Sequence, residues 1–259
     1  MGVPEKSQTI SATVIVLNEE RDLPRCLESL KFCDEIIVID SGSADRTVEV
    51  ARQFGAKVID EPWRGYGAQK NFAMSQAHST WILNIDADEV ITPELRQEIL
   101  AEVASTNPAA GYAVARKTFY MGRWIRYGGW YPNYVTRLCR KTLGSWSEPN
   151  VHEELVLNGE LRRLKNPMLH YTFSDIADQV RTNMRYARQG ALDLKNRGLS
   201  PSYAKLLAKP LGKFVETYFF KRGFLDGLPG FIISINAAHS MFLKYAYLLE
   251  MNRENSDRR

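Results

Sequence analysis

The sequence predicts an α/β protein in which a mostly parallel sheet is flanked by helices. Strand-like and helix-like segments alternate over the first hundred residues, which is the pattern of strands joined by crossover helices. Two of these strands, at residues 35–40 and 81–85, are apolar runs that lead directly into acidic residues. The carboxyl ends of parallel strands meet at one edge of a sheet, where such folds bind ligands. We therefore expect both sets of acids at that edge.

The individual elements follow from side-chain periodicity and from residues that start or stop helices. A helix at 44–54 is stopped by Gly55, and Thr92 and Pro93 supply a hydroxyl N-cap and a proline at the first helical position. In chain order, the expected strands are 11–17, 35–40, 57–59 and 81–85, and the expected helices are 22–30, 44–54, 68–78 and 92–105.

The pattern changes at residue 111. Shorter strands are expected at 112–116 and 134–139, on either side of a loop rich in aromatic residues, glycine and arginine. From residue 174 the pattern is helical, with breaks at 198–201 and 227–230.

The whole pattern divides into two parts, a sheet domain at residues 8–172 and a helical C-terminal region at residues 173–251. The chain has 259 residues, of which 44% are hydrophobic, so it can bury a substantial core. The N-terminus lacks the apolar core of a signal peptide, and the chain has no run of 18 uncharged apolar residues. Three cysteines without metal-ligand spacing indicate reduced thiols. These features favour a cytoplasmic protein without a membrane-spanning helix.

The charge is unevenly distributed along the chain. Residues 1–110 carry 10 Lys/Arg against 18 Asp/Glu, whereas residues 111–259 carry 24 against 12, so the net charges are −8 and +12. A basic C-terminal part is suited to meet anions such as nucleic acid, anionic lipid or a phosphorylated glycolipid. An edge lined by acids would repel a nucleic-acid backbone unless a metal neutralised it, so no nucleic-acid partner is expected.

The strand at 81–85 ends in three carboxylates within four residues, Asp86, Asp88 and Glu89. Crowded carboxylates at the end of a buried strand need a counter-charge, and a hard divalent cation with oxygen ligands is the simplest candidate. In an extended backbone, Asp86 and Asp88 would point to the same side and could approach one ion. The alternative is an ordinary acidic turn before a helix.

Three other segments carry candidate residues. Asp40 leads into Ser41, Gly42 and Ser43 and can accept hydrogen bonds from a base or ribose, while Ser43 or Asp45 is expected to cap the next helix. The glycines and cations at 63–71, among them Lys70, suit a close approach to phosphate. Single residues such as Glu153 and His170 are by default a solvated loop charge and a structural histidine.

Four motifs in order make a more specific pattern. They are Val14-Ile-Val-Leu-Asn-Glu-Glu20, Ile39-Asp-Ser-Gly-Ser-Ala-Asp45, Gly67-Ala-Gln-Lys-Asn71 and Asp86-Ala-Asp-Glu89. This series resembles the family 2 inverting glycosyltransferases of GT-A fold. Val151-His-Glu153, His170-Tyr171 and the basic aromatic C-terminus are similar to the bacterial branch that includes lipopolysaccharide-core β-1,4-glucosyltransferases.

The resemblance implies a role for each matching residue. A nucleotide-sugar would be held by Leu17, Asn18, Glu20, Asp40, Lys70 and Asp86, with Asp40 facing the base. Asp88 would bind the metal, which would be Mg²⁺ or Mn²⁺, and His170 would complete the metal site. Glu153 would be the catalytic base. The chain departs from the family in having Asp40-Ser41 where many relatives carry two aspartates, and it lacks the commonest Glu-Asp form of the base motif, so Glu154 remains an alternative base.

The resemblance also implies transfer of a hexose, glucose by preference, from a UDP-sugar to a glycolipid acceptor such as the lipopolysaccharide inner core. Two rival functions are a nucleotidyltransferase that makes nucleotide-sugars and a non-catalytic nucleotide-sugar or lipid-binding protein of the same fold. A first strand followed by Asn18-Glu-Glu-Arg21 lacks the glycine-rich loop typical of the nucleotidyltransferases. Lysines between apolar residues at 205–222 fit either a solvated helix face or a helix lying on anionic lipid, at the inner face of the cytoplasmic membrane.

Overall fold

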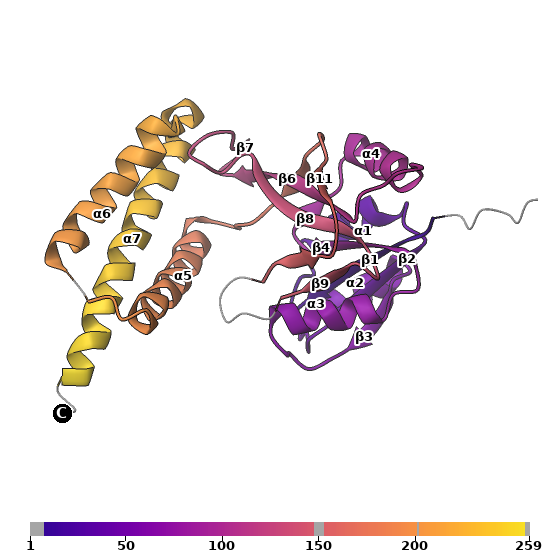
Figure 1. Cartoon of the computed structure of the whole chain (residues 1–259), viewed down its shortest axis with the longest axis horizontal. Helices are drawn as coiled ribbons and strands as arrows, with labels where there is room; N and C mark the ends of the chain where they lie inside the picture. The colour runs from indigo at the N-terminus through magenta and orange to yellow at the C-terminus, as the bar shows by residue number, and fades with distance from the viewer. Residues whose placement is uncertain (1–7, 148–152, 201, 257–259) are drawn as a thin grey trace, which may run out of the picture. The chain divides into compact units, whose positions relative to one another are not determined.

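The computed structural model describes residues 8–147, 153–200 and 202–256 (Figure 1). The chain forms two compact units. The first unit comprises residues 1–117 and 133–171, and the second comprises residues 118–132 and 172–259. The two units are described separately.

The first unit is built on four parallel strands in the order β3-β2-β1-β4. They are β1 (Ile10–Val16), β2 (Glu35–Asp40), β3 (Lys57–Asp60) and β4 (Trp81–Asp86). The strands lie where the apolar runs predicted them, because Val, Ile and Leu suit strands that are covered on both faces. The predicted alternation of strands and helices is confirmed.

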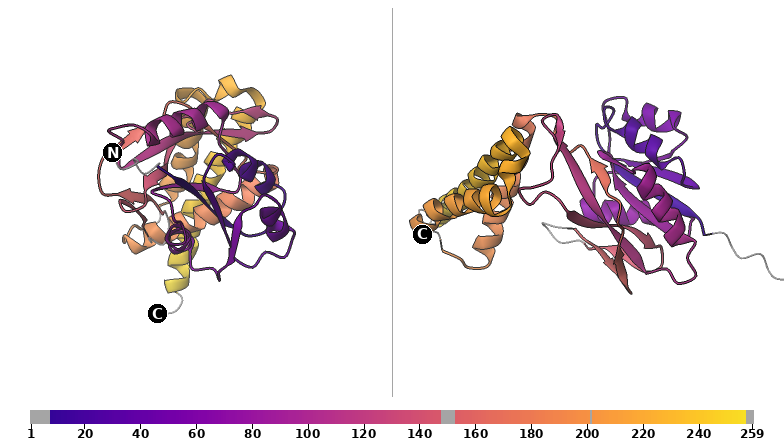
Figure 2. Two further views of the ribbon diagram at one scale, coloured as in Figure 1. Left: turned by 90° about the vertical axis from the view of Figure 1, so that its right-hand side faces the viewer. Right: turned by 90° about the horizontal axis from the view of Figure 1, so that it is seen from above.

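Helices cover both faces of this sheet, as the further views in Figure 2 show. They are α1 (Leu23–Leu30), α2 (Thr47–Gln53), α3 (Tyr66–Ser75) and α4 (Pro93–Val103). Successive strand residues point to opposite faces, so Leu83 packs in the core with α1, α2 and α4, while Ile82 packs with α3. Thr92 caps α4 as expected, accepting a hydrogen bond from the Leu95 backbone at 3.2 Å.

Antiparallel strands extend the sheet beyond β4. The order continues through β8 (Asn133–Arg140) and β6 (Gly111–Tyr120) to β12 (Met168–His170) and β5 (Glu89–Val90). Strand β11 (Leu161–Arg163) pairs with β6, and β9 (Gly144–Trp146) and β10 (Leu155–Leu157) form a separate antiparallel pair. The strands predicted at 112–116 and 134–139 are present and longer than expected.

The second unit is helical, as predicted. It contains α5 (Ile176–Asn196), α6 (Tyr203–Val215), the π-helical turn η1 (Glu216–Phe220), the 3₁₀ turn η2 (Gly223–Asp226) and α7 (Gly227–Ser256). The described helices include none that is long and apolar enough to cross a membrane.

Two predictions for this unit are wrong in detail. The break expected at 227–230 lies instead before Gly227, and Gly230 is inside α7. A Cβ at Gly230 would lie only 1.9 Å from the Gly223 carbonyl oxygen, so this glycine allows close packing and does not end a helix. The segment 118–132, assigned to the sheet domain from sequence, packs with the helices because the buried Asp226 carboxylate accepts hydrogen bonds from the backbones of Arg126 and Tyr127, at 3.0 and 2.8 Å.

Candidate active site

The predicted acids meet at the carboxyl edge of the parallel strands. β1 lies between β2 and β4, and its last residues, Val16 and Ile15, are in register with Asp40 and Asp86 respectively. Leu17, which follows β1, is half exposed at this edge. The structure therefore brings together the ends of the first, second and fourth strands, as the sequence predicted.

Asn18 and Glu20 join the loop after β1 to the loop after β2. The Asn18 side chain accepts a hydrogen bond from the Ala44 backbone at 2.8 Å, and its backbone N–H donates to the Ser43 hydroxyl at 2.9 Å. Glu20 accepts from the Arg46 backbone at 3.0 Å. Asn18 has a positive φ of 57°, which asparagine tolerates better than most residues. These side chains fix the shape of the edge.

Asp40 is buried and organises its own loop. One carboxylate oxygen accepts from the backbones of Gly42 and Ser43, both at 3.0 Å, and the other accepts from the Ser43 hydroxyl at 2.5 Å. The helix predicted at 44–54 begins only at Thr47 because these side-chain bonds hold the preceding residues in turns. Asp45 accepts from the Thr47 backbone, as expected of a capping residue, whereas Ser43 bonds to Asp40.

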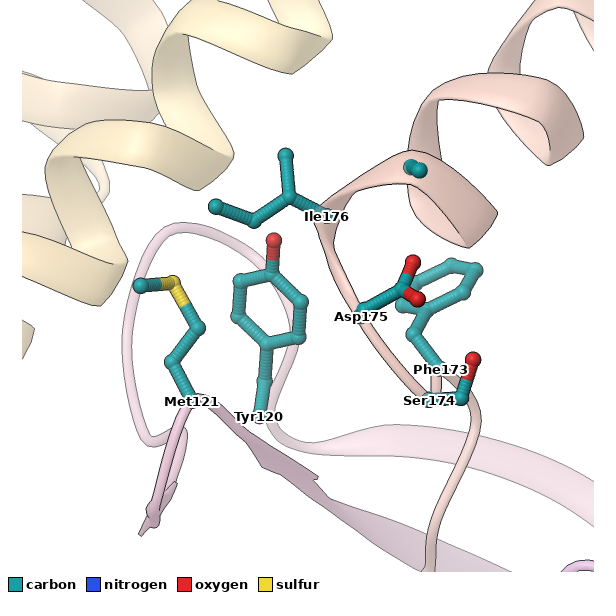
Figure 3. Close-up of a pocket in the computed structure, with 7 residues that line it drawn as sticks. Tyr120, Met121, Phe173, Ser174, Asp175 and Ile176 are labelled. Atoms are coloured by element: carbon teal, nitrogen blue, oxygen red, sulfur yellow. The ribbon is translucent and has the colours of Figure 1, made fainter.

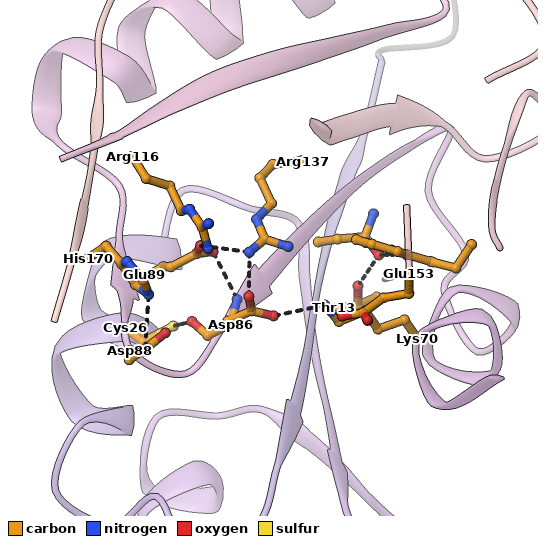
Figure 4. Close-up of polar contacts among 12 residues, drawn as sticks. Thr13, Cys26, Lys70, Asp86, Asp88, Glu89, Arg116, Arg137, Glu153 and His170 are labelled. Carbon is orange, nitrogen blue, oxygen red and sulfur yellow. Dashed lines mark hydrogen bonds and ion pairs between the residues drawn. The ribbon is translucent and has the colours of Figure 1, made fainter. Parts of the chain in front are cut away.

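Asp86 lies between two cations (Figure 4). Its Oδ1 is 3.1 Å from the Lys70 Nζ, and its Oδ2 accepts from the Arg137 guanidinium. Partial burial raises the pKa of Asp86, but the charges of Arg137 and Lys70 outweigh it, so this pKa lies well below its usual range. Asp86 is therefore an anion over the whole physiological pH range.

Glu89 is the third acid of the cluster, and its environment was not predicted. It is fully buried, with its Oε1 2.6 Å from Arg137 and 3.7 Å from Arg116. Burial raises the pKa of Glu89, and Arg137 offsets only part of this because Asp86 shares the same guanidinium. For Asp86 and Glu89, the counter-charge that the sequence assigned to a divalent ion is supplied by protein cations.

Asp88 points away from Asp86 and toward His170 (Figure 4). The extended backbone expected across 86–88 is wrong, because residues 87 and 88 form a turn between β4 and β5. Strand β12 pairs with β5 and places the His170 Nε2 3.1 Å from the Asp88 Oδ2. In the sequence 81 residues lie between Asp88 and His170.

Asp88 and His170 fit a divalent cation as two neighbouring ligands. Two ligands at right angles, each about 2.1 Å from an octahedral ion, are separated by about 3 Å, close to the observed spacing. Among the residues that the structure describes, no group of three acidic, histidine or cysteine side chains could hold a metal. The remaining positions would have to be filled by water or by a substrate, as is usual for Mg²⁺.

Lys70 connects Asp86 to Glu153. Its Nζ is 3.5 Å from the Glu153 Oε1, and its side chain is buried, with the ammonium 4.3 Å from the centre of the Trp146 ring. Asn71 fixes Trp146 by two hydrogen bonds to its backbone, both of 2.8 Å. Glu154 is exposed, so Glu153 is the glutamate that faces the site. Val151 and His152, of the motif that contains Glu153, lie outside the described residues.

Glu19 is a further acid at this edge that the sequence reading did not single out. It is half buried, and burial together with the negative charges of Asp88, Asp22, Asp45 and Asp86 raises its pKa to about 7. Its position in the Asn-Glu-Glu motif was the signal in the sequence that could have identified it, but most of the acids that raise its pKa lie on other segments of the chain.

A separate hollow lies within the second unit (Figure 3). Its volume is about 400 Å³, and its wall is formed by Tyr120, Met121, Phe173 and the first residues of α5. Asp175, whose carboxylate caps α5 by accepting from the Asp178 backbone at 2.7 Å, is the acidic residue of its lining. The hollow is mainly apolar and contains none of the predicted site residues.

Comparison with known proteins decides the family. The model of glycosyl transferase family 2 matches residues 11–154, which is more than half of the chain and includes the whole carboxyl edge described above. The chain belongs to this family. The expected resemblance is confirmed, and the mixed α/β sheet with flanking helices is the GT-A fold that it implied. Family membership favours a glycosyltransferase over the nucleotidyltransferase considered from sequence.

The relatives extend over nearly the whole length of the chain. An uncharacterized glycosyltransferase from Rickettsia felis is 36% identical over 255 residues, which cover 94% of this chain and 90% of the relative. The lipopolysaccharide core biosynthesis glycosyltransferase LpsC from Rhizobium meliloti is 32% identical over 253 residues, covering 93% and 92%. Among solved structures, S. aureus TarS in complex with UDP-GlcNAc is 15% identical with a TM-score of 0.49, covering 95% and 92%.

Proposed function

We propose that this glycosyltransferase moves a hexose, glucose by preference, from a UDP-sugar to a glycolipid acceptor of the lipopolysaccharide inner-core type. The observation that carries the proposal is the convergence of Lys70, Asp86 and Glu153 within one hydrogen-bonded group. A cation suited to phosphate lies there beside a carboxylate suited to act as a base. Family membership supports glycosyl transfer, and the relative named for lipopolysaccharide core biosynthesis supports the acceptor class.

The nucleotide-sugar would bind along the carboxyl edge of the parallel strands. Leu17, Asn18 and Glu20 shape one wall, and Asp40 would lie toward the base. The loop already engages both carboxylate oxygens of Asp40, so this residue would contribute through its remaining acceptor capacity. Asp86 would accept a hydrogen bond from the ribose, and Lys70 would neutralise the phosphate.

Asp88 and His170 would hold Mg²⁺ or Mn²⁺. A bound divalent ion would stabilise the negative charge that develops on the leaving diphosphate. A neutral imidazole and a carboxylate are both accepted ligands for such an ion, with Mn²⁺ the more tolerant of nitrogen.

Glu153 would act as the general base. It would take the proton of the acceptor hydroxyl as that oxygen forms a bond to the anomeric carbon and the bond to the diphosphate breaks. A single displacement of this kind inverts the anomeric centre. The Lys70 Nζ, 3.5 Å from the Glu153 Oε1, contacts this carboxylate at the edge of the sheet.

The acceptor is assigned by class. A lipopolysaccharide inner core carries phosphates and carboxylates, which suit the net charge of +12 that residues 111–259 carry, from 24 Lys/Arg against 12 Asp/Glu. Such an acceptor is available to a protein at the cytoplasmic face of the inner membrane, which is the location that we propose.

The first test is thermal stabilisation by UDP, ADP, GDP and CMP, each with and without Mn²⁺ or Mg²⁺. At 100 times its dissociation constant a ligand adds about 2.7 kcal/mol to the unfolding free energy, which gives a clear shift of the melting temperature. In the wild type we expect stabilisation by UDP but by none of the other nucleotides, and only when the metal is present. In Asp88→Ala we expect this stabilisation to be lost. Stabilisation by another nucleotide would change the donor, and no response to any nucleotide would favour a non-catalytic protein.

A further inference from the structure

The outer face of α6 carries an apolar ridge. Every fourth residue from α6 into η1 is apolar and exposed: Tyr203, Leu207, Leu211, Val215 and Phe219 have exposed fractions of 64, 66, 70, 39 and 53%. Residues four apart on a helix form one continuous row on its surface. Water-exposed rows of this kind are unusual on soluble domains and indicate an interaction surface.

The ridge continues into the turn between α6 and α7. There Phe220 is 80% exposed, the most exposed of the large apolar side chains in the part of the chain that the structure describes. Phe224, Leu225 and Leu228 are exposed beside it in sequence, at 45, 47 and 65%. We call Phe220 and these three residues the apolar tip.

Packing within the second unit leaves most of this apolar surface uncovered, although the Tyr203 hydroxyl accepts a hydrogen bond from the Arg253 guanidinium of α7 at 3.1 Å. Figure 1 shows α6 running alongside α7. The contact between them uses a different row of α6 and η1, in which Phe214 and Tyr218 meet Phe231 of α7 with ring centres 6.1 and 5.7 Å apart. The α6 segment is therefore apolar on two faces, and only one of them is covered by α7.

The surface around the ridge and tip is cationic. Residues 203–228 contain five Lys/Arg and two Asp/Glu. Of the two acids, Asp226 is buried, and Glu216 is paired with Lys213 and Lys221 at 3.1 and 2.6 Å. Lys205, Lys209 and Arg222 are exposed to solvent. An exposed apolar row and tip on a segment of net positive charge is the chemistry that binds the interface of an anionic bilayer.

We propose that the apolar ridge and tip dock this protein on the surface of an anionic lipid bilayer. The apolar side chains enter the acyl boundary, and Arg222, which lies between Phe220 and Phe224 of the tip in sequence, contacts the headgroups. A second copy of the chain fits less well, since a two-fold contact would bring together two segments of the same net positive charge. The inference depends on the second unit alone and stands whether or not the donor is a UDP-sugar.

The test is flotation of the full chain with phosphatidylcholine vesicles, with and without phosphatidylglycerol. We expect strong binding to the anionic vesicles, reduced roughly 100-fold in Leu211→Ser/Phe220→Ser, since each lost apolar side chain accounts for about a factor of ten. Arg222→Gln should lose roughly fivefold, on anionic vesicles only. The matched control is Tyr186→Ser, because Tyr186 is an aromatic residue of α5 that is 56% exposed and lies outside the ridge and tip. This variant should bind the vesicles normally.

Three results would overturn the proposal. The first is failure of the wild type to float with anionic vesicles, and the second is flotation of the Leu211/Phe220 variant equal to that of the wild type. The third is a wild-type dimer in sedimentation equilibrium that the same variant dissociates while vesicle binding is absent, which would make the ridge a contact between copies. Unchanged thermal melting of the variants shows that they are folded, and Leu207→Ser/Phe224→Ser provides a second pair should the first unfold.

Discussion

Replacing Arg137 by methionine should destabilise the first unit strongly, because this one guanidinium neutralises two acids. Arg137 is 3% exposed, and its loss would leave the fully buried Glu89 with Arg116, at 3.7 Å, and the Asp86 backbone N–H, at 3.1 Å. Asp86 would keep Lys70 at 3.1 Å, so most of the cost should arise at Glu89. Breaking a buried ion pair by removing one partner costs about 3–5 kcal/mol, and we expect the lower half of that range.

Urea denaturation at two pH values measures this cost and its cause. Burial already raises the pKa of Glu89, and losing Arg137 raises it further, so stability of Arg137→Met should fall as the pH rises from the ordinary glutamate value toward the folded one. The deficit against wild type should therefore be smaller at pH 5 than at pH 7.5, by at least about 1 kcal/mol. Arg137→Met/Glu89→Gln should recover at least half of the loss, whereas Arg116→Met should cost about 1 kcal/mol or less. A deficit below about 1 kcal/mol for Arg137→Met, or one that neither low pH nor Glu89→Gln relieves, would refute the reasoning.

Three further substitutions test the site. Lys70→Met keeps the packing on Trp146 but removes the charge beside Asp86, so turnover should fall by roughly 100-fold or more in a transfer assay, and near-normal turnover would show that Lys70 does not stabilise the reaction. Glu153→Gln should lose about 10²–10⁴-fold in turnover while UDP still stabilises the protein, whereas exposed Glu154→Gln should stay within about twofold; the reverse order would transfer the role of base to Glu154. Glu19→Gln should raise stability at pH 8 and not at pH 4.5. The wild type loses stability as the pH rises from 4.5 to about 7, and the full shift of the Glu19 pKa corresponds to about 3.4 kcal/mol of unfolding free energy. Because Glu19 is only half buried and solvent screens its charge, we expect about 1 kcal/mol of this difference in the melting curves. An equal effect of this substitution at both pH values would contradict the raised pKa.

The sequence predicted those parts of the fold that depend on neighbouring residues. Strand β4 is a continuous apolar run, and Thr92-Pro93 is a local start signal for α4, so both were found close to their true positions. The start of α2 was missed by three residues because Asp40 and Asp45 bond to their own loops, and such side-chain bonds compete with helix without altering the apolar period. Gly230 was read as a break because a glycine that permits close packing cannot be told by sequence from one that ends a helix.

The cations beside Asp86 and Glu89 were beyond the reach of residue spacing for a different reason, and the pairing of Asp88 with His170 came from the family resemblance alone. The three acids lie close together in the chain, at Asp86, Asp88 and Glu89. Arg137 lies on β8 and His170 on β12, which belong to the antiparallel part of the sheet. No local spacing records which strand will lie beside β4 or β5. Crowded carboxylates therefore indicated that a cation was needed without showing that Arg137 and Lys70 would supply it for Asp86 and that Arg137 would supply it for Glu89.

Because Asp86 and Asp88 have different neighbours, substitutions of these two acids test different roles. Asp86 is held as an anion by Arg137 and Lys70, so its charge does not require an ion, and replacing it would disturb Lys70 and through it Glu153. The Asp88 Oδ2 lies 3.1 Å from the His170 Nε2, a spacing that would suit two neighbouring ligands of one cation. Loss of activity in an Asp86 variant would therefore say little about metal. Metal dependence is tested at Asp88, where Asp88→Ala should abolish the difference in UDP binding with and without Mn²⁺ while leaving the Arg137 cluster intact.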